Sequence, residues 1–389
     1  MKNHLFKAFT MASMLLASVM FTACMNNDDE TIIIELPNTG IPDDSQATMN
    51  PTVSSVTAQI PNIQTSLEEM NGILVIRVDM TGIKNSEGID WLRLVGTGQS
   101  GQNVWVEVDG KPKGILVYNN SDDNDGRSIM TDVVFTVDNS GSMSEEANTI
   151  ARDIVSWAQL LTNSRLDVLF GVVGYGGFIS GAINITSVTE LSDYLNAGNG
   201  TNRTKHFGGA DASELTQYAS SFPRTSNSVS SNECGAMAIQ FADTYFSFRS
   251  GANRIYVNFT DEPNQPEGNI DYSVKFFEDQ NNWPAAKGTV HTVYSEDVFT
   301  TNTWNKKEQP WLISEYTGGT TLFTSSSFSD VTLESLPVTG AMENSYIIRF
   351  TNIDELLDGN YHLVHITIIS EDGTVQADKT FNVLFPKRP

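Results

Sequence analysis

The sequence predicts an α/β fold with a doubly wound, mostly parallel sheet, flanked in the chain by two β-rich segments. Between residues 130 and 328, apolar runs alternate with stretches of helical periodicity, as in βα units joined by right-handed crossovers. On either side, short runs of alternating apolar residues are separated by Gly, Asn and Asp turns. We therefore expect a β-rich segment over 51–125, the α/β domain over 130–328 and a second β-rich segment over 335–386.

The elements of the α/β domain follow from the spacing of apolar residues. The run at 132–137 predicts a buried strand, and the helical spacing of Ile150, Ile154 and Trp157 predicts the helix after it. A Ser-rich stretch over 212–232 should delay a helix that begins near Glu233. The other expected elements are strands at 166–173, 254–259, 288–294 and 320–323, and helices near 270–281 and 306–316.

Three oxygen-bearing side chains follow the first of these strands. Asp138, Ser140 and Ser142 alternate in the loop that leaves its carboxyl end, which is where open α/β sheets place their ligand sites. One carboxylate and two hydroxyls neutralise a hard divalent ion only in part, so the ion keeps positions open to an outside oxygen. Ser142 also fits a helix-capping box, but capping does not account for Asp138 or Ser140.

This pattern resembles the von Willebrand factor type A (VWA) domain, whose metal-ion-dependent adhesion site begins with Asp-x-Ser-x-Ser. Asp138, Ser140 and Ser142 match that motif, and Asp261, directly after the strand at 254–259, matches the closing aspartate. The resemblance implies a Rossmann-like fold, a bound Mg²⁺ (or Mn²⁺ or Ca²⁺), and a protein or glycan ligand that offers a carboxylate or another oxygen to the ion.

The middle element of the family pattern departs from the usual threonine. Asp211 is the best match to that position, with Ser213 and Thr204 as alternatives. A further carboxylate near the ion would reduce its net positive charge and weaken its attraction for an acidic ligand. Asp211 could equally be a solvated loop residue, so this position stays open.

The two β-rich segments each hold few strands. Alternating runs such as 73–78 and 105–108 lie before the α/β domain, and runs at 345–350, 361–369 and 380–384 lie after it. Neither segment is sufficient for an independent sandwich, but together they are. We expect one β-sandwich built from both ends with the α/β domain inserted, an arrangement that resembles integrin β subunits and some pilus adhesins.

The first residues carry a targeting signal. Lysines precede an apolar stretch from Ala8 to Ala23, so residues 1–23 are interpreted as a signal peptide. Phe21 to Cys24 resembles a bacterial lipoprotein box, which implies lipidation of Cys24; a single transmembrane anchor is the alternative, although the stretch is short for one. Residues 24–50 are interpreted as a tether. The acidic residues just after Cys24 are similar to surface-export signals of Bacteroidota lipoproteins, so we expect an outer-membrane protein exposed on the cell surface.

Composition agrees with an acidic extracellular globule. The 389 residues include 47 acidic and 23 basic side chains, for a net charge of −24. Nucleic acid is excluded as a partner because phosphate binding needs a basic stripe, and the sequence has none. If Cys24 is lipidated, Cys234 has no cysteine left to pair with and should pack as a small apolar residue.

Together these features predict a surface-anchored, metal-dependent binding protein and no enzyme. A fimbrial tip subunit of the same fold is the structural alternative. A metal-assisted hydrolase is the enzymatic one, with Asp211 or Glu233 as its general base. Trp283, Trp304 and Trp311 are interpreted as core residues in preference to a sugar-stacking platform.

Overall fold

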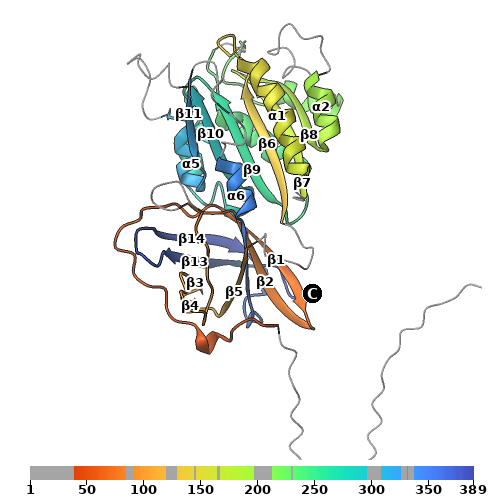
Figure 1. Cartoon of the computed structure of the whole chain (residues 1–389). Coiled ribbons are helices and arrows are strands. Elements are labelled where there is room, and N and C mark those ends of the chain that lie inside the picture. Colours follow the sequence, from red (N-terminus) through yellow and green to blue (C-terminus); the bar gives the residue numbers. More distant parts are fainter. Residues whose placement is uncertain are drawn as a thin grey trace, which may run out of the picture. The chain divides into compact units, whose positions relative to one another are not determined.

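A six-stranded sheet with helices on both faces occupies the middle of the chain (Figure 1). Its order is β11-β10-β9-β6-β7-β8, and all neighbours are parallel except β8, which runs antiparallel to β7. The strands are β6 (Met130–Asp138), β7 (Asp167–Tyr175), β8 (Ile179–Thr186), β9 (Asn253–Thr260), β10 (Thr289–Ser295) and β11 (Thr321–Thr324). The predicted α/β class with a mostly parallel sheet is therefore confirmed.

This computed structural model describes most of the chain beyond the amino-terminal segment. The described residues are 39–84, 91–119, 129–143, 146–163, 167–196, 213–228, 231–295, 308–325, 331 and 337–389. The predicted signal peptide, Cys24 and most of the tether lie outside this set, as does Trp304. Within the described part, no helix is long and apolar enough to cross a membrane.

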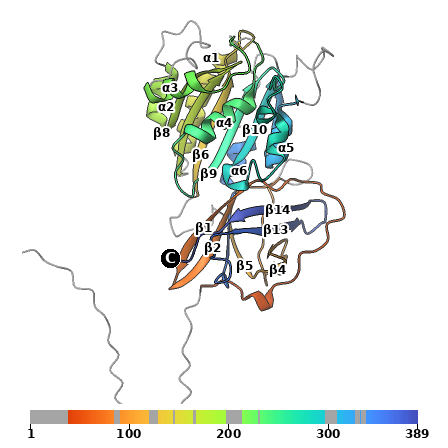
Figure 2. The same ribbon diagram turned by 180° about the vertical axis from the view of Figure 1, so that it is seen from behind.

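Helices cover both faces of the sheet. One apolar core lies under α1 (Glu146–Asn163), α2 (Val188–Asn196) and α6 (Pro337–Glu343), with Ile154 and Trp157 of α1 buried in it. A second core lies under α3 (Ser213–Ser221), α4 (Gly235–Tyr245) and α5 (Trp311–Thr317). Figure 1 shows α1 in front of the sheet, and Figure 2, from behind, shows α4 there.

Three local predictions for the α/β region differ from the structure. The helix expected near 270–281 is two short 3-10 turns, η3 (Ile270–Tyr272) and η4 (Val274–Phe277), because Ser273 between them has extended backbone and its side chain caps η4. The helix expected near Glu233 is present as α4, which begins at Gly235, but the Ser-rich stretch before it contains an additional helix, α3. The helix expected near 306–316 begins only at Trp311, after Pro310.

Two four-stranded antiparallel sheets complete the described fold. Their orders are β1-β2-β12-β5 and β14-β13-β3-β4. The strands are β1 (Ile63–Met70), β2 (Ile73–Met80), β3 (Val104–Val108), β4 (Lys111–Pro112), β5 (Ile115–Asn119), β12 (Tyr346–Phe350), β13 (Tyr361–Ile369) and β14 (Gln376–Leu384). Each sheet combines strands from before and after the α/β region, and one apolar core includes residues of both, as expected of a sandwich built from the two ends.

The central strand β6 positions the candidate site. It pairs with β7 on one side and β9 on the other, and every residue from 131 to 138 is buried. The carboxyl ends of β6 and β9 therefore lie side by side at one edge of the sheet. Asp138 ends β6 and Asp261 directly follows β9, so the parallel register places the two aspartates near each other.

Candidate metal centre

Asp138 is held from two strands and is fully buried. Its Oδ1 accepts a hydrogen bond from the backbone N–H of Ser140 at 2.9 Å. Its Oδ2 accepts one from the Thr260 hydroxyl, at the end of β9, at 3.0 Å. Both carboxylate oxygens are thus fixed in direction by neutral donors, and neither has a cationic partner among the described residues.

The two serines of the motif lie next to each other. The Oγ atoms of Ser140 and Ser142 are 2.9 Å apart. Ser140 is buried and Ser142 is exposed, so the pair runs from the interior to the surface. Ser142 also makes a side-chain hydrogen bond with Asp261. The structure therefore brings Asp138, Ser140, Ser142 and Asp261 together; Ser144 and Glu145 of the capping box lie outside the described residues.

Asp261 carries an unsatisfied oxygen. The residue is only 9% exposed, and its Oδ1 is buried with no hydrogen-bond donor among the described residues. The next residue, Glu262, has a buried Oε2 in the same condition. Burying a carboxylate oxygen without a donor or a cation costs free energy, so these two atoms are available to a hydrogen-bond donor or a cation.

Burial raises the pKa of every acidic group in this cluster, and neighbouring carboxylates raise it further for some of them. Burial raises the pKa of Asp138 well above its usual value, and the nearby carboxylate of Asp261 raises it further. Burial also raises the pKa of Asp261, against a lowering contribution from the Ser142 hydrogen bond. For Glu262, burial and then the charges of Asp261 and Glu233 raise the pKa to about 8. A divalent cation among these groups would favour their ionised forms, so metal binding should release protons.

Glu233 is a fourth carboxyl of this cluster. It lies just before α4, is 7% exposed, and its Oε2 accepts a hydrogen bond from Gln265 at 3.2 Å. Burial raises its pKa, and the charge of Asp261 contributes in the same direction. The sequence indicated Glu233 only as a candidate base, and it gave no sign that Glu262 would have a buried oxygen.

The remaining candidates for the family's threonine position are not placed. Asp211 and Thr204 lie outside the described residues, and Ser213 begins α3 with its side chain outside them. The assignment of Asp211 therefore stays a prediction.

The donor set fits a hard divalent ion. Two carboxylates and two hydroxyls are oxygen ligands of the kind that Mg²⁺ and Mn²⁺ take, and four donors leave room for water and a ligand. In the described part of the chain, no three side chains of His, Cys, Asp and Glu are arranged to hold a metal ion. Asp138 and Asp261 are the two carboxylates proposed as ligands there, so a third carboxylate, histidine or cysteine ligand would have to come from outside that part.

A buried polar network under the site orients Thr260. Asn258 Oδ1 accepts hydrogen bonds from the hydroxyls of Thr136 at 2.8 Å and Tyr175 at 2.9 Å, and the Tyr175 hydroxyl also contacts Thr260. Asn258 in turn needs Gly235 at the start of α4, because a Cβ there would lie 2.8 Å from its amide nitrogen. No motif in the sequence indicated this support, since its members come from separate strands.

Cys234 is buried and its thiol has low reactivity, in line with the prediction that it packs as a small apolar residue. Its Sγ donates to Asn264 Oδ1 at 3.2 Å, and burial raises the pKa of the thiol to about 12. A thiol in this state is a poor nucleophile.

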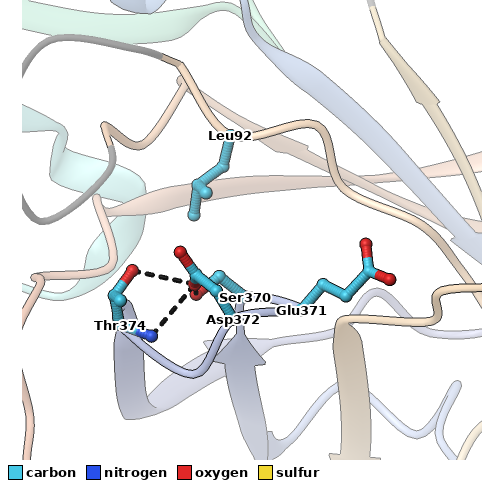
Figure 3. A pocket seen from close by; sticks show the side chains of 5 residues that line it. All are labelled: Leu92, Ser370, Glu371, Asp372 and Thr374. Atoms are coloured by element: carbon cyan, nitrogen blue, oxygen red, sulfur yellow. Dashed lines mark hydrogen bonds between the residues drawn. The ribbon is translucent and has the colours of Figure 1, made fainter.

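A separate cavity of about 360 Å³ lies at the β13–β14 turn (Figure 3). It is lined by Leu92, Ser370, Glu371, Asp372 and Thr374. The Asp372 carboxylate already accepts hydrogen bonds from the backbone and hydroxyl of Thr374 and from the Ser370 hydroxyl. These bonds lower the pKa of Asp372, so this carboxylate stabilises the turn and, unlike Asp261, has donors of its own.

Comparison with known proteins gives only weak similarities. The sequence matches no model of a known protein family and no curated protein. Among solved structures, an aerotolerance-related membrane protein from Bacteroides fragilis is 14% identical with a TM-score of 0.30, over 51% of this chain and 93% of that one. The pilus adhesin SpaC from Lactobacillus rhamnosus GG, in its open conformation, is 11% identical with a TM-score of 0.34. That similarity covers 83% of this chain and 47% of SpaC, so this chain spans about half the length of the adhesin. TM-scores this low carry no functional argument.

Proposed function

We propose that this protein is a cell-surface-anchored binding protein of the VWA type, in which a divalent ion completes its coordination with an oxygen of the ligand. Asp138, Ser140, Ser142 and Asp261 would hold the ion, with Asp211 as a further ligand. The fold contributes the strand order β11-β10-β9-β6-β7-β8, which puts the ends of β6 and β9 side by side. When bound, the ion supplies a Lewis acid with an open position.

The observation that carries this proposal is the buried, unsatisfied Oδ1 of Asp261 beside the fully buried Asp138. The charge of Asp261 raises the pKa of the buried Asp138, and two buried carboxyls side by side are unfavourable without a counter-charge. Ser142 is exposed and makes a hydrogen bond with Asp261, which supports entry of an ion and its ligand from this side.

Calorimetric titration with Mg²⁺ and Mn²⁺ tests the site. Asp138→Ala should abolish metal uptake because it removes a central oxygen ligand, while wild type should bind either ion. Asp354→Ala is the matched control, since it removes one carboxylate that is 73% exposed and far along the sequence from the motif. Metal uptake that is equal in Asp138→Ala and in wild type would refute the assignment.

Anchoring is a second part of the proposal, and it rests on the sequence around Cys24. Cys24→Ser should leave an unlipidated precursor that does not reach the surface. Replacement of residues 26–30 by alanine should keep the lipid but leave the protein facing inward. Protease treatment of intact cells distinguishes these results, because only surface-exposed protein is digested; equal digestion of wild type and the alanine variant would exclude an export role for residues 26–30.

Metal-assisted hydrolysis is the second candidate function. Glu262, whose pKa is raised to about 8, and Glu233 beside it have the character of general bases near a Lewis acid. A panel of chromogenic carboxyl and phosphoryl esters, assayed with Mg²⁺ or Mn²⁺, separates this candidate from binding. Turnover that is lost in Glu233→Gln and Glu262→Gln would favour the hydrolase.

A further inference from the structure

The turn between β7 and β8, at residues 176–178, lies beside the loop that carries the Asp-x-Ser-x-Ser motif. The backbone N–H of Asn139, the second residue of the motif, donates to the carbonyl oxygen of Tyr175 at the end of β7, at 2.6 Å. The Asn139 side chain donates to the Ser180 hydroxyl, near the start of β8, at 2.8 Å. The residues on both sides of the turn are therefore bonded to the loop of the candidate metal centre.

The loop that follows α3 packs on the same turn. Its Thr225 and Ser226 backbone N–H groups both donate to the Gly177 carbonyl oxygen at 2.9 Å. A Cβ on Gly177 would lie 2.4 Å from the Ser226 Cβ and from the Ser231 carbonyl oxygen, so glycine is what allows this close approach. The loop is thus held at the edge of the sheet where the candidate metal centre lies.

Arg224 belongs to this loop, and its guanidinium lies over the ring of Phe178 in the turn. The distance from Cζ to the ring centre is 5.2 Å, which is the geometry of a cation–π contact. The Nη2 group also donates to the Ser220 carbonyl oxygen at 3.4 Å. Arg224 is exposed and Phe178 is partly buried. These two contacts position the guanidinium without neutralising its charge.

Arg224 has different partners from most arginines in the described part of the chain. Six of the others form an ion pair with a carboxylate, namely Arg77, Arg152, Arg249, Arg254, Arg349 and Arg388. Arg224 forms no ion pair with any described residue, although the chain has 47 acidic side chains. Most of its N–H groups therefore remain available to a carboxylate from another molecule.

We propose that the ligand is an acidic peptide with two carboxylates, of which one completes the coordination of the ion and the other pairs with Arg224. The inference rests on the proposed metal-dependent binding function and adds its ligand class. An arginine binds a carboxylate through two parallel hydrogen bonds, so this contact gives direction as well as affinity. An extended peptide advances about 3.5 Å per residue, so two acidic side chains a few residues apart can reach across the β7–β8 turn.

The aromatic residues favour a peptide over a saccharide. The ring of Phe178 carries the guanidinium, so the turn presents a charge where a sugar site would present an open ring face. Of the tryptophans that the sequence assigned to the core, Trp283 is buried. Trp311 is partly exposed, but its ring packs edge-to-face on Tyr294, with ring centres 5.1 Å apart.

The first test is calorimetry of synthetic decapeptides on the full chain in Mg²⁺. Peptides with two aspartates, one to four residues apart, are compared with peptides that have one aspartate. The best two-aspartate peptide should bind about ten-fold more tightly than the one-aspartate peptide. Arg224→Gln should remove this difference and leave the one-aspartate affinity within about two-fold, whereas Arg224→Lys should keep part of the difference because it retains the charge.

Controls separate the possible failures. Arg388→Gln removes an arginine that is 61% exposed near the carboxyl terminus, and it should leave the two-aspartate preference intact. If wild type takes up no Mg²⁺, the proposed function fails as well. If it takes up Mg²⁺ but shows no two-aspartate preference, or if Arg224→Gln keeps that preference, only the present inference fails. Binding of a uronic-acid hexasaccharide in place of every peptide would overturn the ligand class.

Chemical modification tests the contact at Arg224 directly. Phenylglyoxal reacts with accessible guanidinium groups, and peptide mapping by mass spectrometry measures the rate at each arginine. Arg224 should react faster than Arg349, whose side chain is 5% exposed and paired with Glu68. The two-aspartate peptide, added with Mg²⁺ at ten times its dissociation constant, should slow the reaction of Arg224 about ten-fold, as mass action requires. The rate at Arg388 should not change. An Arg224 rate that bound peptide does not slow would exclude Arg224 from the ligand site.

Discussion

Strand β6 has a buried aspartate near each end, and the two aspartates have opposite kinds of partner. Near its start, the Asp132 carboxylate is fully buried and bound by Arg249, whose backbone N–H and Nε each donate to it at 2.7 Å. At its end, Asp138 is equally buried, and its donors are a neutral hydroxyl and a backbone N–H. The protein supplies its own cation at one end, and at the other end we propose that a cation from solution binds.

Arg249 makes several further hydrogen bonds at this end of the sheet. Its guanidinium also donates to the Asp167 carboxylate at 2.5 Å and to the carbonyl oxygens of Thr131 and Asp167. The ion pair of Arg249 with Asp132 therefore stabilises the fold, because removing one partner leaves the other buried and unpaired. The same reasoning predicts that neutralising Asp138 changes the stability of the fold little and abolishes the proposed metal binding.

The largest expected effect is therefore on stability at the paired end. Asp132→Asn should lower the free energy of unfolding by about 3 kcal/mol, measured by urea denaturation, while leaving Mg²⁺ uptake unchanged. Glu355→Gln, which breaks the exposed ion pair of Glu355 with Lys111, is the control and should cause no measurable loss. A metal affinity that falls in Asp132→Asn would show that the two ends are coupled.

At the end of β6 that carries Asp138, a substitution should affect only metal binding and the stabilisation that the metal gives. Magnesium at 100 times its dissociation constant should stabilise wild type by about 2.7 kcal/mol, as mass action requires. Asp138→Asn should gain nothing from magnesium, and without metal it should be as stable as wild type, because it loses no cationic partner. Thermal unfolding with Mg²⁺ and with EDTA measures both. If Asp138→Asn unfolds as easily as Asp132→Asn does, Asp138 has a structural role and the contrast between the two ends fails.

The sequence was sufficient for the parts of the site that depend on strand ends. Asp138 and Asp261 each follow a long apolar run, and parallel strands bring their carboxyl ends to one edge, so their proximity could be predicted without contacts. The hydrogen-bond network that supports Asp138 could not be predicted in this way. Thr260, Asn258 and Tyr175 are polar residues in or at the ends of apolar strands, and only the register of three strands makes them neighbours.

Local errors in the fold have a similar cause. Tyr272, Val274 and Phe277 are buried at a spacing that is compatible with a helix, but Asn269 and Ser273 cap the backbone into separate turns. In α3, few apolar side chains mark the helix; Leu215 and Ala219, four residues apart, are its buried residues among the described side chains. Such weak signals depend on tertiary packing, which a single sequence does not display.

His362 provides a third arrangement, in which two carboxylates face an imidazolium that loses its charge when it is deprotonated. Its Nδ1 lies 2.7 Å from Asp109 and its Nε2 lies 3.1 Å from Asp358, so both ring nitrogens face carboxylates and the doubly protonated form is favoured. Burial alone would lower the pKa of His362, but the hydrogen bonds with Asp109 and Asp358 outweigh it and raise the pKa. His291 is the opposite: burial lowers its pKa to about 4, and no carboxylate contributes.

The smallest expected effect is the pH dependence that follows from this difference. A raised folded pKa means that the His362 contribution is fully present below about pH 6.5, the unfolded value, and is lost as the pH rises through the folded pKa. The destabilisation caused by His362→Gln should therefore shrink from pH 6 to pH 9. For His291, whose folded pKa is the lower one, the destabilisation caused by His291→Gln should grow between about pH 4 and pH 6.5 and then stay level. Urea unfolding of both variants and wild type across this range measures the two slopes. Slopes of the same sign would mean that Asp109 and Asp358 do not hold a charged imidazole, and the paired carboxylates of the sandwich would then resemble the unpaired ones at Asp138.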